Sequence, residues 1–296
     1  MHPDPHPTSP FLRGELSEAE QRPERALFHV IPAPLELTVS YGSGARRGPQ
    51  AILEASEQLE RWDGAGEPCE AGIYTQAPVL CDEMSAAQEE LRRRGYALTQ
   101  ARKLPVTLGG EHSLSYGVVK GIMEALGRPI GLIQIDAHAD LRVAYQGHEH
   151  SHASVMHLLA QEGCQIASFG VRAFCKEEAE QRERYGVYAW DAEELVTQNI
   201  QRVTLPEGFP EEVYITFDLD GLDPAVLPAT GTPVPGGLGF YQSLSLISSA
   251  LEGRRCVGLD VVELAPVEGQ PVSDFTAALI TYRLMGLALR SLGRSR

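Results

Sequence analysis

The sequence predicts an α/β fold in which a central, mostly parallel sheet carries helices on both faces. Short apolar runs alternate along the chain with longer helical patterns, and this alternation is typical of βαβ units. Apolar runs such as Gly131–Ile135 (GLIQI) contain little polar alternation, so both faces of these strands are expected to be covered. The 296 residues show no internal repeat and no long linker, which favours one domain.

Residues 1–25 differ from the rest because they are rich in proline and charge. They are expected to form a flexible arm with one helical turn in Glu15–Arg22, and residues 26–296 to form the single domain. The apolar runs predict strands at Phe28–Ala33, Pro105–Leu108, Ile130–Asp136, Gln165–Val171, Val187–Trp190, Val213–Phe217 and Cys256–Val262. The longer patterns predict helices at Pro49–Trp62, Ala86–Lys103, Leu114–Leu126, Ser154–Glu162, Tyr241–Leu251 and Asp274–Leu292.

Composition excludes several classes of function. A net charge of -15 argues against nucleic acid and anionic membranes as partners, because both require clustered Lys and Arg. The chain has no apolar signal core near Met1 and no apolar run of about 18 residues, so neither secretion nor a membrane span is expected. The five cysteines are odd in number and form no C-x-x-C pair, which favours a reducing, cytoplasmic location.

The strongest chemical signal is Asp136-Ala-His138-Ala-Asp140, directly after an apolar strand. Alternate residues of an extended segment project to one side, so the three polar side chains are expected to converge. Ligands of parallel sheets bind beyond the carboxyl ends of the strands, where this motif lies. The motif therefore predicts a metal site, although a polar loop that happens to hold this pattern is the alternative.

Two further strand ends carry similar residues. Asp218 and Asp220 follow an apolar strand, and two carboxylates so close would repel each other unless a cation or a proton lay between them. Asp223 precedes a proline and is expected to shape a turn. His112 follows two glycines at a third strand end, where helix capping or surface exposure is the alternative role.

Together these positions offer four carboxylates and two imidazoles. So many oxygen ligands do not fit a structural zinc site, whereas the mixture suits manganese or a similar first-row ion. Six ligands with two bridging carboxylates can hold two ions, which would lower the pKa of a shared water. The predicted ligands are His112, Asp136, His138, Asp140, Asp218 and Asp220.

Three segments resemble the signatures of the ureohydrolase family, which contains arginase and agmatinase: Gly109–Ser113 (GGEHS), Asp136–Asp140 (DAHAD) and Phe217–Pro224 (FDLDGLDP). The resemblance runs from about residue 30 to the C-terminus. It implies a three-layer arginase-like fold, two Mn²⁺ per chain and a homotrimer or homohexamer. Glu111 replaces the Asp that is often found in the family before the first histidine, and Ala229 replaces a common Gly. Further matching segments are Ser40–Ala51, Thr230–Gly237 and Asp260–Pro266.

The resemblance also implies a role for each site residue. It assigns His112 and Asp140 to one ion, and His138 and Asp220 to the other. It makes Asp136 and Asp218 the bridges between the two ions. Glu263 lies where the family binds the guanidinium group of its substrate, and His152 where the family keeps a proton-shuttling histidine. Asp140 is expected to pass a proton to the leaving nitrogen.

The substrate is expected to be a small guanidino compound, with agmatine, which would yield urea and putrescine, the best single candidate. The segment Leu141–Ser151 lacks the Asn that arginases use to recognise the amino-acid head group, and it resembles agmatinases. Arg142 could instead face a substrate carboxylate, although a solvated or ion-paired role is favoured. Guanidinobutyrase, guanidinopropionase, arginase and formimidoylglutamase activities remain alternatives, as does a non-catalytic metal-binding relative.

Overall fold

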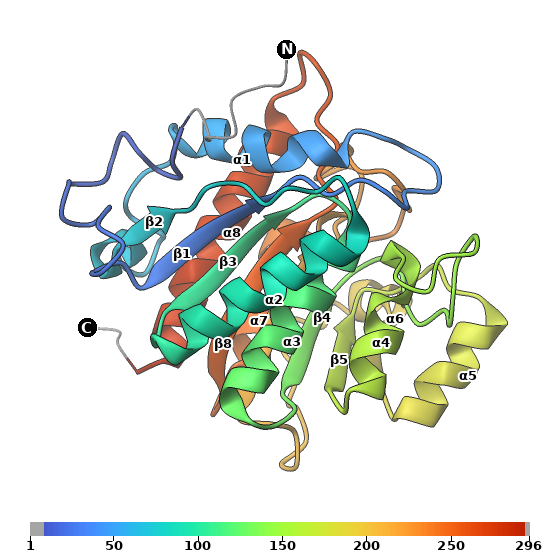
Figure 1. The fold of residues 1–296 in the computed structure, drawn as a ribbon. Helices are drawn as coiled ribbons and strands as arrows, with labels where there is room; N and C mark the ends of the chain where they lie inside the picture. Colours follow the sequence, from blue (N-terminus) through green and yellow to red (C-terminus); the bar gives the residue numbers. More distant parts are fainter. Residues whose placement is uncertain (1–8, 294–296) are drawn as a thin grey trace.

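The computed structural model describes residues 9–293, and its centre is an eight-stranded sheet in which all neighbouring strands are parallel (Figure 1). The seven predicted strands are confirmed, each within two residues of its predicted ends. β2, which has three residues, was not predicted. The strands are β1 (Phe28–Ala33), β2 (Ile73–Thr75), β3 (Leu104–Gly109), β4 (Gly131–Ile135), β5 (Gln165–Phe169), β6 (Tyr188–Trp190), β7 (Glu212–Asp218) and β8 (Arg255–Val262).

The order of the strands in the sheet is β2-β1-β3-β8-β7-β4-β5-β6. β3 and β4 are consecutive strands of the chain, but the late strands β8 and β7 lie between them. In register, Leu108 pairs with Val261, Val261 with Phe217, and Phe217 with Ile135. The carboxyl ends of these four strands are therefore level, at the kind of topological switch point where parallel sheets bind ligands.

Helices cover both faces of the sheet, which confirms the three-layer prediction (Figure 1). Successive strand residues enter opposite cores: Leu132 packs in the core under α2, α3 and α4, and Ile133 in the core that contains residues of α1, α7 and α8. The predicted helices are confirmed with shifted ends as α1 (Gly48–Ser56), α2 (Met84–Gln100), α3 (Ser115–Leu126), α4 (Val155–Gln161), α7 (Phe240–Ala250) and α8 (Val272–Ser291).

Two helices, α5 (Lys176–Tyr185) and α6 (Ala192–Thr197), were not predicted. α5 buries only Glu178, so its sequence lacks the apolar stripe from which a helix is usually recognised. Among the described residues, α8 alone is long and apolar enough to cross a membrane by length and composition. It packs against α1 and β8, and many of its side chains belong to the core, so in this fold it is a core helix.

Residues 9–25 correct the expectation of a flexible arm. Phe11 and Leu12 are fully buried, and their backbone N–H groups donate to Thr75 Oγ1 and Ser56 Oγ at 2.9 Å each. The Phe11 ring also lies 6.5 Å from the ring of Tyr282 on α8. Within Glu15–Arg22 the Gln21 N–H donates to Ser17 O at 3.3 Å, which forms a single turn of the expected kind but no regular helix. Residues 1–8 lie outside the described part of the chain.

Candidate metal centre

The predicted ligands meet at the level carboxyl ends of β3, β8, β7 and β4. His112 opens a short 3-10 turn that follows β3, and Asp218 is the last residue of β7. Asp136 follows β4, and Glu263 follows β8. Residues from four strands thus reach one point, although more than 150 positions separate the first from the last.

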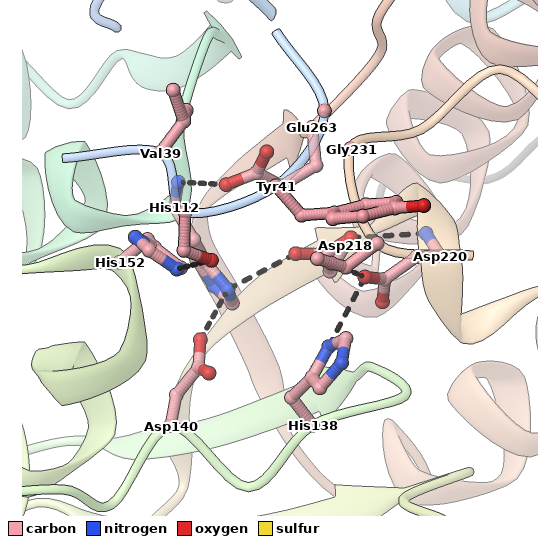
Figure 2. Close-up of a pocket in the computed structure, with 13 residues that line it drawn as sticks. Val39, Tyr41, His112, His138, Asp140, His152, Asp218, Asp220, Gly231 and Glu263 are labelled. Carbon is pink, nitrogen blue, oxygen red and sulfur yellow. Dashed lines mark hydrogen bonds and ion pairs between the residues drawn. The ribbon is translucent and has the colours of Figure 1, made fainter. Parts of the chain in front are cut away.

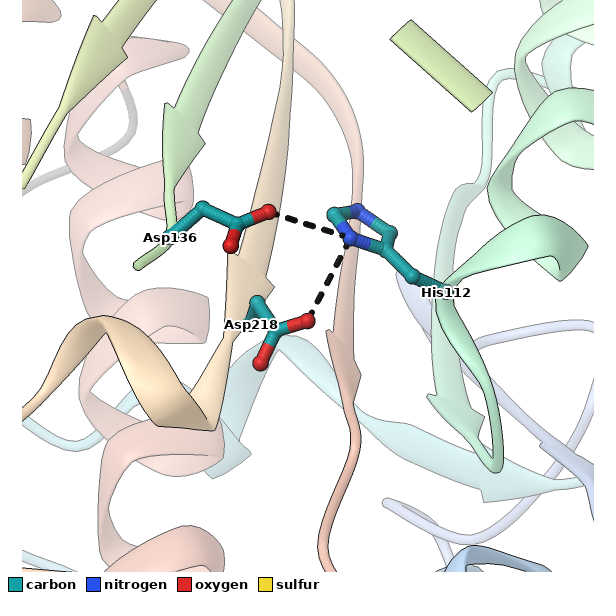
Figure 3. Close-up of side chains that lie close together, drawn as sticks. All are labelled: His112, Asp136 and Asp218. Carbon is teal, nitrogen blue, oxygen red and sulfur yellow. Dashed lines mark ion pairs between the residues drawn. The ribbon is translucent and has the colours of Figure 1, made fainter. Parts of the chain in front are cut away.

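The first cluster surrounds the ring nitrogen Nδ1 of His112 (Figure 3). This atom lies 3.0 Å from Asp140 Oδ2, 3.3 Å from Asp136 Oδ2 and 3.4 Å from Asp218 Oδ2. All four side chains are buried. One nitrogen and three carboxylate oxygens around one point form a donor set suited to a hard or borderline divalent ion.

The second cluster surrounds His138 and shares Asp136 with the first. His138 Nδ1 lies 3.1 Å from Asp220 Oδ2 and 3.6 Å from Asp136 Oδ1. The two oxygens of Asp136 therefore face different imidazoles, as a bridging carboxylate requires. Asp218 lies with the first cluster, and its Oδ1 accepts the N–H of Asp220 at 2.9 Å.

The negative charge of the two clusters also favours metal ions at this site. Burial raises the pKa of Asp218 well above its usual range, and the nearby carboxylates of Asp220 and Asp136 raise it further. Among the described residues, the buried Nδ1 of His112 has no hydrogen-bond partner of good geometry. Four buried carboxylates without a Lys or Arg side chain in the cluster require positive charge from elsewhere, and divalent ions would supply it.

Two site residues have strained backbones. Asp140 (φ 53°) and Glu263 (φ 67°) are among the few non-glycine residues of the described chain with positive φ. Such conformations cost about 1–3 kcal/mol each and persist where the surroundings fix them. The Glu263 N–H donates to Gly110 O at 2.8 Å, which ties the end of β8 to the end of β3.

A buried hydrogen-bond chain stands behind His112. Its Nε2 lies 2.7 Å from Thr216 Oγ1, which donates to Asp260 Oδ1 at 2.7 Å. Ser115 Oγ donates to the other oxygen of Asp260 at 2.6 Å. Because the Thr216 proton points to Asp260, its oxygen accepts from Nε2–H, which leaves Nδ1 of His112 free to bind an ion.

No role was predicted for Thr216 or Asp260 from the sequence, although a feature of the sequence could have indicated each of them. Thr216 is a polar residue inside an apolar strand and lies two positions before Asp218, so both side chains leave the same face. Asp260 was part of a recognised motif. The other missed residue is Arg172, which donates to the carbonyls of Asp220, Leu222 and Val234 and so holds two site loops together. A lone arginine in a polar stretch gives no such signal.

Glu263 and His152 line the pocket above the two clusters (Figure 2). Glu263 Oε1 accepts the backbone N–H of His112 at 2.8 Å. Burial raises the pKa of Glu263, and the charges of Glu111 and Asp220 add to the rise, while the His112 hydrogen bond opposes it. Burial lowers the pKa of His152. The pocket is narrow, with a cavity volume of about 20 Å³, and it is partly open to solvent.

The pocket mouth includes residues of two segments that resemble the ureohydrolase family, Ser40–Ala51 and Thr230–Gly237. Val39, Ser40, Tyr41 and Gly42 line one side, and Gly231 and Thr232 the other. The Gly42 N–H donates to Gly231 O at 3.1 Å, and a side chain at Gly42 would clash with that carbonyl. The Tyr41 ring extends across the pocket in Figure 2, while most of its surface is exposed.

Arg142 does not line this pocket. Its Nε lies 3.7 Å from Glu178 Oε2, and its guanidinium stacks 4.7 Å from the centre of the Tyr145 ring. The ion-paired role favoured by the sequence is therefore what the structure shows.

Comparison with known proteins indicates the same family as the sequence motifs. Residues 26–286 match the Arginase family. The chain is 37% identical to an N(1)-aminopropylagmatine ureohydrolase of Synechocystis sp., with 87% of each chain covered. It is 31% identical to an agmatinase of Pyrococcus horikoshii, covering 88% of this chain and 92% of the relative.

A solved structure agrees. The agmatine ureohydrolase of Thermoplasma volcanium superposes with a TM-score of 0.81 at 25% identity, covering 96% of this chain and 97% of the other. The family, the shared Asp136 and the two clusters around His112 and His138 all indicate a centre for two metal ions. This chain belongs to the arginase family and is a ureohydrolase, a hydrolase that acts on guanidino compounds.

Proposed function

We propose that the protein is a manganese-dependent ureohydrolase that converts agmatine to urea and putrescine, a step of polyamine synthesis. One observation carries the choice of substrate: the pocket is lined by carboxylates, imidazoles, the Tyr41 ring and smaller residues, and no Lys or Arg is among its lining residues. A guanidinium with a cationic tail fits such a surface. The carboxylate of arginine or 4-guanidinobutyrate would lose its hydration without gaining a charged partner.

N(1)-aminopropylagmatine is the second candidate, and a specific observation favours it. Relatives at 37%, 35% and 33% identity bear the name N(1)-aminopropylagmatine ureohydrolase. This compound shares the guanidinium end of agmatine and differs by a longer cationic tail. The product besides urea would then be the corresponding triamine. Both candidate substrates would place a guanidinium group at the clusters around His112 and His138, and neither substrate carries a carboxylate.

Manganese is the metal that we propose for both positions. The donor set consists of four carboxylates and two imidazoles, and both imidazoles face the clusters through Nδ1. Mn²⁺ accepts a donor set of this kind. When bound, the ions would lower the pKa of water at the site and so make a nucleophile available near neutral pH. His112 and Asp140 would hold one ion, His138 and Asp220 the other, with Asp136 and Asp218 shared.

The chain's own residues bind the substrate and move protons. Glu263 keeps free acceptor capacity after its bond from His112, so it can receive paired N–H groups of the guanidinium. Asp140 would take a proton from the attacking water and pass it to the leaving nitrogen. His152, at the pocket wall, exchanges protons with solvent.

We also propose a cytoplasmic homotrimer or homohexamer. All five cysteines are free, which supports a reducing compartment. The assembly is an expectation from family membership.

A urea-release assay with Mn²⁺-loaded protein tests the proposal. Agmatine, N(1)-aminopropylagmatine, arginine and 4-guanidinobutyrate are compared by kcat/KM. The two carboxylate-free compounds are expected to exceed the other two by at least about 100-fold, because the pocket offers no charged partner to a substrate carboxylate. The ratio between the first two compounds decides between the two candidates. A preference for arginine or 4-guanidinobutyrate would contradict the assignment.

A further inference from the structure

Glu111 is a fully buried carboxylate that neither metal cluster uses. Four donors surround it: the N–H groups of Leu37 (2.5 Å) and Thr38 (2.7 Å), and the hydroxyls of Thr38 (2.7 Å) and Ser113 (2.6 Å). Within residues 9–293 no Lys or Arg forms an ion pair with it. A buried carboxylate is stable without a cation only where hydrogen bonds compensate for its lost hydration, and here they come mostly from a loop more than 70 residues away.

That loop, Glu36–Gly42, carries one wall of the active-site pocket. The ends of β1 and β3 hold its start, since the Glu111 N–H donates to Leu35 O at 2.8 Å. The approach is so close that a Cβ atom on Gly110 would lie 1.9 Å from the same carbonyl oxygen. The Glu111 side chain therefore binds Leu37 and Thr38, just beyond the point where the Glu111 backbone already contacts Leu35.

The Thr38 hydroxyl continues this contact to His152. Its proton points to Glu111, because a carboxylate only accepts, so its oxygen is left to accept from His152. The backbone N–H of His152 lies 3.2 Å away, and the ring Nδ1 3.3 Å away. The ring must then carry its proton on Nδ1. Nε2 is left as an acceptor, 3.4 Å from the hydroxyl of Ser40 on the pocket wall.

We propose that Glu111 and Thr38 are positioning residues, in which Glu111 fixes Thr38 and the Thr38 hydroxyl holds the His152 ring with Nδ1 protonated and Nε2 available for proton exchange. The inference rests on the proposed role of His152. The Glu111 carboxylate reaches the Glu36–Gly42 loop through the N–H groups of Leu37 and Thr38.

The kinetic test uses Thr38→Val, which keeps the shape but removes the hydroxyl, with Thr38→Ser as the matched control. With agmatine and Mn²⁺, Thr38→Val is expected to lower kcat at least about 10-fold with KM changed less than about twofold, while Thr38→Ser recovers most of kcat. Glu111→Asp should reproduce the loss at unchanged metal content. In a His152→Ala background, Thr38→Val should change kcat less than about twofold. Full additivity of the two losses would overturn the proposal.

A crystal structure of the Mn²⁺-loaded Thr38→Val protein supplies a readout that needs no activity. The His152 ring is expected to leave the position seen beside residue 38, while Thr38→Ser keeps it. An unmoved ring in Thr38→Val overturns the inference even if the enzyme hydrolyses agmatine. Conversely, a wild-type protein that releases urea from no guanidino compound refutes the proposed function, and a displaced ring would still support the positioning role.

Discussion

Manganese affinity should depend on Thr216, a residue that would not touch an ion. The Thr216 hydroxyl accepts from Nε2–H of His112 and donates to Asp260, and all three side chains are almost completely buried. Thr216→Val keeps the side-chain volume but removes both hydrogen bonds. His112 then loses the contact that directs its proton to Nε2 and its Nδ1 to the metal position.

The structure sets the scale of the effect. A buried group left without its hydrogen-bond partner costs about 1–3 kcal/mol, and the change leaves Nε2–H of His112 and Oδ1 of Asp260 in that state. Loss of a partner behind a metal-binding histidine typically weakens metal binding by about 10–100-fold. We expect this range for the ion held by His112, which corresponds to about 1.4–2.8 kcal/mol.

Calorimetric titration of metal-free protein with Mn²⁺ measures this affinity directly. Thr216→Ser, which keeps the hydroxyl, should bind nearly as well as wild type. Thr281→Val is the matched control for loss of a buried hydroxyl, because Thr281 bonds only to the Ala277 carbonyl within α8. Wild-type affinity in Thr216→Val, or an equal loss in Thr281→Val, would refute the reasoning.

Three other predictions concern the metal centre, one ion pair and the proposed assembly. Chelation should abolish urea release, and Mn²⁺ should restore it. Asp136→Ala should lose at least one ion and nearly all turnover, because both clusters share this carboxylate. One zinc per chain at full activity would contradict the two-ion centre. Hydrogen bonds from Arg61 lower the pKa of Glu20 from 4.5 to about 2, so its stabilising effect is present above pH 4.5 and is lost as the pH falls toward 2. In urea denaturation between pH 5 and pH 2, Glu20→Gln should therefore lose less stability than wild type, and equal losses would count against this ion pair. Light scattering at micromolar concentration should show a trimer or hexamer, and a monomer would contradict the proposed assembly.

Local patterns in the sequence predicted most strands and helices of the fold. β1 has the predicted bounds, Phe28–Ala33, and the other predicted strands shift by no more than two residues. Burial on both faces of a parallel sheet leaves a continuous apolar run, so the strand is visible in the chain itself. The same holds for Asp136, His138 and Asp140, whose alternate spacing after a strand predicts convergence without knowledge of any other segment.

Segments without an apolar pattern of their own were decided by tertiary contacts. α5 is almost entirely polar, and it was missed. Residues 9–25 look like a disordered arm by composition, yet Phe11 and Leu12 enter a core built from α1, α8 and neighbouring strands. A few apolar residues suffice for docking when distant elements provide the site, and composition alone does not reveal that site.

By itself, the sequence determined the fold class, the candidate ligands and the family, because each depends on residue types at short spacing. The position of β8 and β7 between β3 and β4 followed only from the tertiary structure, and it brings Asp136 Oδ2 and Asp218 Oδ2 to 3.3 Å and 3.4 Å from His112 Nδ1. The tertiary structure also decided the ion pair of Arg142 and the contact of Glu111 with Thr38. Pairing between distant strands and loops depends on the packing of the whole chain, and no local pattern encodes it.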